Sequence, residues 1–248
     1  MAERLYIKRS ASIEPLKVES DRTDTEQQIV GQKSSPAGYK KKPSFDTPYS
    51  LFIIISGGER RERDYFKVIQ NHGNLFPRIK IVFIADPNKL DPKGLLEIAK
   101  ERQEYYSTSE SEENPDAYFL VSDVDHFYND LIGIKKESAN KGFNIIISNP
   151  CFEVWLYYSK RDDLFEGFVV PDDYLKTSRQ IKQWLNTAIP GGVNPAKAIF
   201  DIEANIINAK KYYGVDDNGI PLLFATNMIV LAEAILPFIK NGLSQLQQ

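Results

Sequence analysis

The sequence predicts an α/β protein whose mostly parallel sheet is flanked by helices and followed by a helical extension. Four apolar segments rich in β-branched and aromatic residues alternate with four amphipathic segments up to residue 159. This alternation is typical of right-handed βαβ crossovers, which join parallel strands through a helix. Beyond residue 160 only helical patterns continue. We therefore expect a flexible leader at residues 1–46, an α/β core at 47–160 and a helical extension at 161–248 packed on that core.

The first strand is predicted at residues 49–56, which carry no charge and end in Gly57 and Gly58. Uncharged runs of this kind are typical of strands that parallel sheets bury on both faces. The next helical pattern ends at Gly73, and a later one is predicted to begin with Pro150 in its first turn. Further strands are expected at 78–86, 117–123 and 143–149, and helices at 59–73, 93–107, 128–142, 150–159, 171–189, 195–213 and 224–241.

Composition favours a soluble protein with a sizeable core and excludes several kinds of site. Hydrophobic residues make up 42% of the chain and aromatic residues 12%, which is sufficient for a large core. The single cysteine, Cys151, excludes an intrachain disulfide and a cysteine-based zinc site, and two histidines are too few for a histidine cluster. No segment approaches the roughly 18 uninterrupted apolar residues of a membrane span, and the N-terminus lacks a signal-peptide core. We expect a cytoplasmic protein without membrane contact.

Charge limits the ways in which the protein could bind nucleic acid. The formal net charge of −3 argues against binding through bulk electrostatics. This net charge does not exclude local binding of phosphate groups, particularly through a metal. The leader carries the basic run 40–42, and we interpret it as an arm that docks on a partner, with an arm that reaches for nucleic acid as the alternative.

Acidic side chains follow the ends of all four predicted strands. They are Glu59 and Glu62 after the first, Asp86 after the second, Asp123 and Asp125 after the third, and Glu153 after the fourth. Because functional crevices of open parallel sheets lie outside the carboxyl ends of the strands, we expect these acids to converge there. Clustered carboxylates repel one another unless a cation neutralises them, and oxygen ligands suit Mg²⁺ or Mn²⁺. The sequence therefore predicts a Mg²⁺ or Mn²⁺ site at this edge of the sheet.

Each of these residues also has a purely structural interpretation. An aspartate after a strand often caps the next helix, and Asp86 before Pro87 can simply shape a turn. Glutamates at a helix start complement the helix dipole. His126, beside the aspartate pair, is either a group that supports a metal ligand or an exposed loop residue. Cys151 is interpreted as a small buried filler, since no histidine lies near it in the sequence to activate it.

Three motifs make the chain resemble the RloB-like proteins. They are 57-GGERRERDYF-66, the aspartate pair at 123–125 and 148-SNPCFEVWLYYS-159, in the family's order. The corresponding family motifs read roughly E-G-x-x-T-E-x-x-Y-F, D-x-D and S-N-P-x-F-E-x-W-L, and the third match is long and specific. The resemblance covers roughly residues 50–240, including the late stretch 221–236. It implies a Toprim-like fold with a metal-dependent nuclease or related phosphoryl-transfer site. It also implies a role near restriction or abortive-infection loci and an AAA-type ATPase partner.

The resemblance assigns roles to four acids of this chain. Asp123 and Asp125 match the family's aspartate pair, Glu62 its second glutamate, and Glu153 the glutamate of the third motif. In Toprim folds the metal is held by the aspartate pair and by a glutamate after the first strand.

The chain departs from the family pattern at Gly57, which stands where the family has that first glutamate. Glycine can neither bind a metal nor transfer a proton. Either Glu59 takes over the role as a metal ligand, or Glu62 does, or this protein is catalytically weak or inactive.

Two functions of different classes follow. The first is a Mg²⁺-dependent nuclease acting on DNA or RNA in anti-phage defence with an ATPase partner, in which Glu153 orients a ligand or a water. The neighbouring Arg60, Arg61, His126 and Asn149 would contact the substrate, the arginines by binding phosphate bidentately; a solvated helix face is the alternative for the arginines. The second is a non-catalytic module that binds nucleic acid or a nucleotide. A nucleotidyl transferase is a weaker third option, since the chain has no G-x-x-x-x-G-K-[ST] loop. The sequence does not indicate an oligomeric state.

Overall fold

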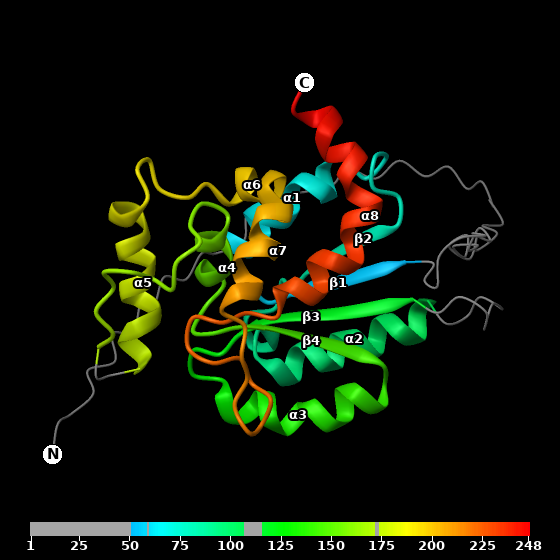
Figure 1. The fold of residues 1–248 in the computed structure, drawn as a ribbon. Coiled ribbons are helices and arrows are strands. Elements are labelled where there is room, and N and C mark those ends of the chain that lie inside the picture. The colour runs from blue at the N-terminus through cyan, green and yellow to red at the C-terminus, as the bar shows by residue number, and fades with distance from the viewer. Residues whose placement is uncertain (1–50, 59, 107–115, 172–173) are drawn as a thin grey trace, which may run out of the picture. The chain divides into compact units, whose positions relative to one another are not determined.

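In the computed structural model, the chain forms a four-stranded, all-parallel sheet with the strand order β2-β1-β3-β4 (Figure 1). The structure describes residues 51–58, 60–106, 116–171 and 174–248. All of these belong to one compact unit that spans residues 39–248. Helices flank the sheet and a long helix ends the described chain, so the predicted α/β class with a parallel sheet is confirmed.

The elements follow in the predicted sequence of strands and helices. They are β1 (Phe52–Ser56), α1 (Arg61–Asn71), β2 (Ile79–Phe83), the 3₁₀ helix η1 (Pro87–Lys89), α2 (Pro92–Tyr106), β3 (Ala117–Asp123), α3 (Tyr128–Asn140), β4 (Phe143–Ser148), α4 (Glu153–Tyr158), α5 (Tyr174–Ala188), α6 (Pro195–Ala198), the 3₁₀ helix η2 (Ile199–Asp201), α7 (Ile202–Lys211) and α8 (Met228–Leu246). The helix expected at 195–213 is therefore divided into α6, η2 and α7. The predicted leader lies outside the described residues.

The predicted helix start at Pro150 is wrong. The Asn149–Pro150 peptide bond is cis, and α4 begins only at Glu153. Before the helix, the chain continues along the edge of the sheet. The Asn149 amide donates to the carbonyl of Ala225 at 3.0 Å, and its own carbonyl accepts from the Phe224 amide at 2.8 Å. These bonds hold an extended conformation that a helical first turn could not adopt.

The segment that precedes α8 closes the free edge of β4. The backbone amide of Asn227 donates to the carbonyl of Ile147 at 3.0 Å. The Asn227 side chain accepts a hydrogen bond from the Ile147 amide and donates one to the Ile145 carbonyl at 2.9 Å. Edge strands carry unpaired amides and carbonyls, and this segment satisfies several of them. The helix predicted from residue 224 therefore begins only at Met228.

The two faces of the sheet support separate hydrophobic clusters. Ile53 and Leu120 pack with residues of α2 and α3 on one face. Ile54 and Val121 pack with residues of α1, α4, α7 and α8 on the other, and Figure 1 shows these helices on opposite sides of the strands. Successive side chains of a strand point to opposite faces. Asp123, two residues after Val121, therefore faces the side of α1 and α4.

The helices after residue 160 share the larger of the two clusters. It contains Ile181 and Leu185 of α5, Ile202 of α7 and Leu231 of α8, together with side chains of β1, β3 and β4. The α/β part and the later helices thus bury their apolar faces against each other.

Helix α8 is long and apolar enough to cross a membrane by length and composition, and it is the one such helix within the described residues. Its apolar residues, Leu231 among them, pack into the larger hydrophobic cluster. Its exposed side carries Glu233, which pairs with Lys210, and Lys240, which pairs with Glu203 at 2.7 Å. Ion pairs on one side and core packing on the other are typical of a helix that covers a protein core.

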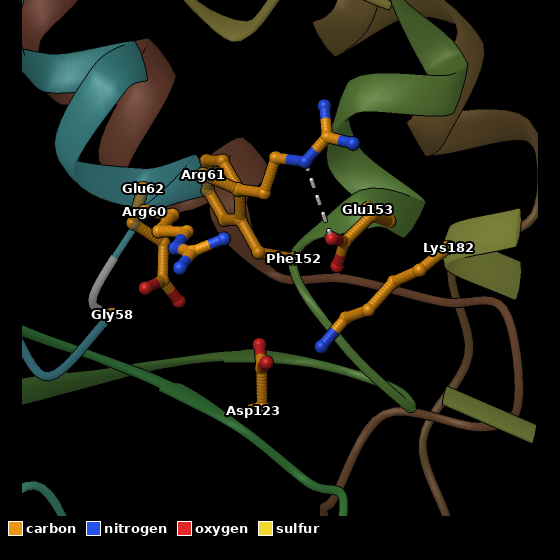
Figure 2. Close-up of a pocket in the computed structure, with 8 residues that line it drawn as sticks. All are labelled: Gly58, Arg60, Arg61, Glu62, Asp123, Phe152, Glu153 and Lys182. Carbon is orange, nitrogen blue, oxygen red and sulfur yellow. Dashed lines mark ion pairs between the residues drawn. The ribbon is translucent and has the colours of Figure 1, made fainter. Parts of the chain in front are cut away.

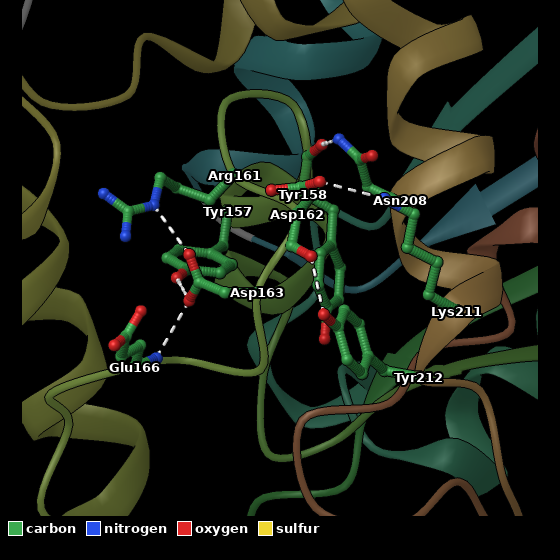
Figure 3. Close-up of polar contacts among 9 residues, drawn as sticks. All are labelled: Tyr157, Tyr158, Arg161, Asp162, Asp163, Glu166, Asn208, Lys211 and Tyr212. Carbon is green, nitrogen blue, oxygen red and sulfur yellow. Dashed lines mark hydrogen bonds and ion pairs between the residues drawn. The ribbon is translucent and has the colours of Figure 1, made fainter.

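A polar network fixes the loop that follows α4 (Figure 3). The Asp163 carboxylate accepts a hydrogen bond from the Tyr157 hydroxyl and pairs with Arg161 Nε at 2.8 Å. The neighbouring Asp162 pairs with Lys211, at the end of α7, at 2.9 Å. These contacts anchor the carboxyl end of the short helix α4 and so help to fix the orientation of the helix, which begins at Glu153.

Candidate functional site

A cavity of about 430 Å³ opens at the carboxyl end of the sheet. Its lining residues are Gly58, Arg60, Arg61, Glu62, Asp123, Phe152, Glu153 and Lys182 (Figure 2). The strand order places β1 beside β3, while the helices that follow these two strands cover opposite faces. Ligands of open α/β sheets bind in the crevice at such a switch point. The cavity therefore lies where the fold is suited to hold a ligand.

Three of the predicted acids line this cavity from three different elements. Glu62 is the second residue of α1 and is 5% exposed, Asp123 is the last residue of β3, and Glu153 is the first residue of α4 and is 2% exposed. Figure 2 shows the three carboxylates facing the same space. The ring of Phe152 packs against Tyr65 of α1 with centroids 5.5 Å apart, which fixes α4 relative to α1.

Burial and repulsion by neighbouring carboxylates raise the pKa values of Glu62 and Asp123. Burial, together with the negative charge of Glu153, raises the pKa of Glu62 to about 8, against the opposing effects of Lys182 and Ser56. Burial is also the main reason that the pKa of Asp123 lies well above its usual range, and Glu62 and Glu153 raise it further. Near neutral pH, Glu62 therefore favours its protonated form as long as no cation neutralises the site.

Basic side chains border the acids. Arg61 Nε lies 3.7 Å from a carboxylate oxygen of Glu153, and Arg61 Nη1 donates to the Val193 carbonyl at 3.1 Å. Arg60 is exposed at the mouth of the cavity. Lys182 reaches in from α5, and Figure 2 shows its ammonium between Glu153 and Asp123. The cavity thus combines three carboxyl groups with three cationic side chains.

The turn after β1 is shaped around its two glycines. A Cβ atom on Gly58 would lie 0.8 Å from a carboxylate oxygen of Glu62, so that carboxylate rests against the backbone of Gly58. A Cβ atom on Gly57 would lie 2.8 Å from the carbonyl oxygen of Leu90. The chain thus has little room for the glutamate that the family pattern places at position 57, and the Glu62 carboxylate lies one residue away. Glu59, the other predicted substitute, lies outside the described residues.

The remaining predicted residues of the strand-three loop lie beside the cavity and do not line it. The Asp125 amide donates to the Pro150 carbonyl at 2.9 Å, and the Asp125 side chain is 29% exposed. The His126 side chain is 62% exposed, and its ring lies 3.9 Å from that of Phe127. His126 matches the exposed-loop interpretation. Of the aspartate pair, it is Asp123 that enters the cavity.

Three further residues have structural roles. Asn149, predicted to contact substrate, donates from its side chain to the Pro221 carbonyl at 2.6 Å and does not line the cavity. Asp86 accepts from the Asn88 amide at 2.9 Å, which confirms the turn interpretation. Cys151 is fully buried, which confirms the filler interpretation, and burial raises the pKa of its thiol.

The cavity has the donor chemistry of a divalent-cation site in an open arrangement. Oxygen atoms of Glu62, Asp123 and Glu153 are the hard ligands that Mg²⁺ and Mn²⁺ prefer. One carboxylate oxygen of Asp123 is buried and has no hydrogen-bond partner among the described residues, so within that part of the chain its lone pairs are free for a ligand. No three His, Cys, Asp or Glu side chains in the described part of the chain are close enough to hold one metal ion as they stand. A bound ion would have to draw these carboxylates together.

Sequence reasoning missed Lys182 and Phe152 as cavity residues. Phe152 lies inside the third motif, between two residues already singled out, and its aromatic ring is a detectable signal. Lys182 has no such signal, because it stands in an amphipathic segment 23 residues after the end of the third motif at residue 159. Only the packing of α5 against α4 brings it to the acids.

Comparison with known proteins identifies the family. A profile of the RloB-like protein family matches residues 52–218, which is more than half of the chain. Comparisons with curated proteins and with solved structures give no match. The matched range contains every residue that lines the cavity. The chain therefore belongs to the family of RloB-like proteins.

Proposed function

We propose that this protein is a Mg²⁺- or Mn²⁺-dependent phosphodiesterase that cleaves nucleic acid, as its Toprim-like motifs suggest. One observation carries the proposal: Glu62, Asp123 and Glu153, far apart in the sequence, line a single cavity at the switch point of a parallel sheet. Arg60 and Arg61 lie at the same cavity. Carboxylates that hold a cation beside cationic groups that bind phosphate are the usual requirements of phosphoryl transfer.

The acids and the arginines of the cavity have separate roles in this proposal. A divalent ion held by Glu62, Asp123 and Glu153 would polarise the scissile phosphate and lower the pKa of a bound water. Arg60 and Arg61 bind the phosphate oxygens. Without a cation the Glu62 carboxyl group keeps a proton near neutral pH, since its pKa is about 8; cation binding by Glu62 therefore releases this proton. Glu153 also orients the attacking water.

The family resemblance alone supports two parts of the proposed biological setting: anti-phage or abortive-infection defence, and control by an AAA-type ATPase. The cytoplasmic location stays a prediction from the sequence. Both DNA and RNA are candidate substrates.

A non-catalytic binding module is the second candidate, favoured by two specific observations. Gly57 stands where the family has a glutamate, and within the described residues no three potential ligands are assembled around one point. Such a module would bind nucleic acid through Arg60 and Arg61 without cleaving it.

A cleavage assay distinguishes the two candidates. The purified protein, alone and with an AAA-type ATPase encoded beside it, is incubated with duplex DNA, single-stranded DNA and tRNA in Mg²⁺, Mn²⁺ or EDTA. We expect metal-dependent cleavage that Asp123→Asn lowers at least about a hundredfold, because the central oxygen ligand loses its charge. The control Asp130→Asn alters a surface residue of α3 that pairs with Lys93 and should leave the rate unchanged.

The opposite result is equally clear. Nucleic-acid binding without cleavage under every condition, with the same affinity in wild type and Asp123→Asn, would establish the binding module and refute the enzyme.

Gly58→Ala tests the role of Glu62 without changing any acid. The new methyl group would take the place of the Glu62 carboxylate, so that carboxylate must leave its present position in the cavity. We expect a folded protein with at least about tenfold weaker divalent-cation binding, measured by isothermal titration calorimetry. The control Gly133→Ala lies on α3, where a Cβ atom meets nothing within 4 Å; it should preserve binding and stabilise the helix by up to about 1 kcal/mol. Unchanged binding in Gly58→Ala would remove Glu62 from the cation site.

A further inference from the structure

Lys182 has an unusual position among the residues that line the cavity. It belongs to α5, which joins the larger hydrophobic cluster through Ile181 and Leu185, and much of its side chain is exposed to solvent. Its ammonium nevertheless points into the cavity, between Asp123 and Glu153 (Figure 2). A flexible lysine on a helix surface would normally extend into water, so this direction calls for an electrostatic cause.

The charges around Lys182 supply that cause. Glu153 is already paired with Arg61 at 3.7 Å, whereas Asp123 keeps a buried oxygen for which the described part of the chain provides no hydrogen-bond partner. Both carboxyl groups attract the Lys182 ammonium, and the attraction is mutual. Within the described residues, Lys182 faces these two groups without closing into a tight ion pair. The ammonium therefore stands in the region that a cation bound to both groups would occupy.

We propose that Lys182 is the internal counter-ion of this site and competes with the divalent cation for Asp123 and Glu153. In the cation-free protein its ammonium offsets the negative charge of the two carboxylates. A divalent ion that enters must displace the ammonium or bear its repulsion, which at a separation of several ångströms remains substantial inside a protein. Lys182 thereby sets the cation concentration at which the site fills. This inference rests on the proposed function only in assuming that the acids bind a divalent cation.

Two simpler roles for Lys182 make different predictions. A lysine that is merely solvated would affect cation binding no more than any other surface charge of α5. A lysine that binds only the substrate phosphate would leave cation affinity unchanged in the absence of nucleic acid. The cation affinity measured without nucleic acid therefore distinguishes a lysine that competes with the cation from both alternatives.

The test is isothermal titration calorimetry of the full chain with Mg²⁺ and with Mn²⁺, without nucleic acid, at constant pH and ionic strength. Lys182→Gln should bind the cation about tenfold more tightly than wild type, because the competing charge is gone. Lys182→Arg keeps the charge and should remain within about twofold of wild type. The control Arg179→Gln removes an exposed cation from the same helix, outside the cavity lining, and should also remain within about twofold. Equal or weaker binding by Lys182→Gln would overturn the proposal.

Failure of the proposed function would be recognisable in the same experiment. If neither wild type nor any variant binds a divalent cation, the metal-dependent function is refuted, and the counter-ion role is then decided by calorimetric melting in EDTA. A melting temperature of Lys182→Gln at least a few degrees below that of Arg179→Gln would support the counter-ion. Equal melting temperatures would reject it.

Discussion

A buried carboxyl group that titrates near pH 8 makes the stability of the folded protein depend on pH. The pKa of Glu62 is raised by burial and by Glu153 from 4.5 to about 8, so between these values the folded state binds a proton that the unfolded state has lost. The free energy of unfolding therefore falls as the pH rises through this range. The raised pKa of Asp123 acts in the same direction.

We predict that wild-type protein in EDTA loses on the order of a few kcal/mol of unfolding free energy between pH 5 and pH 8.5. Glu62→Gln should flatten this dependence, because the amide does not titrate. Urea denaturation at closely spaced pH values measures the slopes. Asp163 and Asp216, whose pKa values are lowered, titrate below this window and do not disturb it.

Glu203→Gln, on the surface of α7, is the matched control and should retain the wild-type slope. A slope shared by wild type and Glu62→Gln would show that the Glu62 carboxyl group is not buried in solution.

The sequence identified most of the residues that line the cavity, but not all of them. The motifs singled out Glu62, Asp123 and Glu153, because acids that follow parallel strands share an edge. The alternation of side chains along β3 decides that Asp123 enters the cavity, whereas Asp125 lies beyond the strand and has a positive φ of 27°. Lys182 could not be predicted, since its place depends on how a distant helix packs.

Among the elements, the segment before α8 has the clearest energetic role. Its residue Asn227 forms two side-chain hydrogen bonds with the edge strand β4. Removing them leaves the Ile147 amide and the Ile145 carbonyl with fewer partners, and a buried group that loses its partner costs about 1–3 kcal/mol.

We predict that Asn227→Ala lowers the unfolding free energy by about 1–3 kcal/mol in urea denaturation. Asn227→Asp keeps an acceptor for the Ile147 amide and loses the donor to Ile145, so its effect should be intermediate or similar. Asn140→Ala, at the exposed end of α3, should change the free energy by less than about 0.5 kcal/mol. A wild-type midpoint in Asn227→Ala would mean that solvent satisfies the edge of β4.

This segment also explains why two helix boundaries were mispredicted. The apolar pattern from residue 224 fits a helix, and Pro150 is a common first residue of helices. Both stretches instead pair with each other, through Phe224, Ala225 and Asn149. Local periodicity contains no information about such a long-range pairing, so tertiary contacts override it.

For the molecule as a whole, the larger hydrophobic cluster joins the sheet to the helices after residue 160. A chain that ends after Ser159 would lack α7 and α8 and would expose the apolar face of α1, α4 and the sheet that they cover. We predict that this fragment has no cooperative thermal transition by circular dichroism and elutes as aggregates in size-exclusion chromatography. The control is a chain that lacks only residues 1–46, which should unfold cooperatively. A monomeric, cooperatively folding fragment would show that the sheet and its first helices are independent.

The fold class followed from the alternation of strand and helix patterns, whereas the strand order did not. Periodicity shows where Phe52–Ser56 and Ala117–Asp123 form strands, but their adjacency depends on the α2 connection passing over β1. The position of the cavity depends on β1 lying beside β3. The sequence therefore predicted that the acids lie at the carboxyl edge of the sheet, but not which of them line the same cavity.

The larger hydrophobic cluster has a consequence for folding during translation. Strand β1 emerges early, but α8, which completes its surroundings, begins at Met228. Translation proceeds at about 5–20 residues per second, so the roughly 175 residues between them take roughly 10–35 seconds to appear. During that interval the apolar side chains that α8 covers in the folded protein lack this partner, which favours aggregation of the nascent chain.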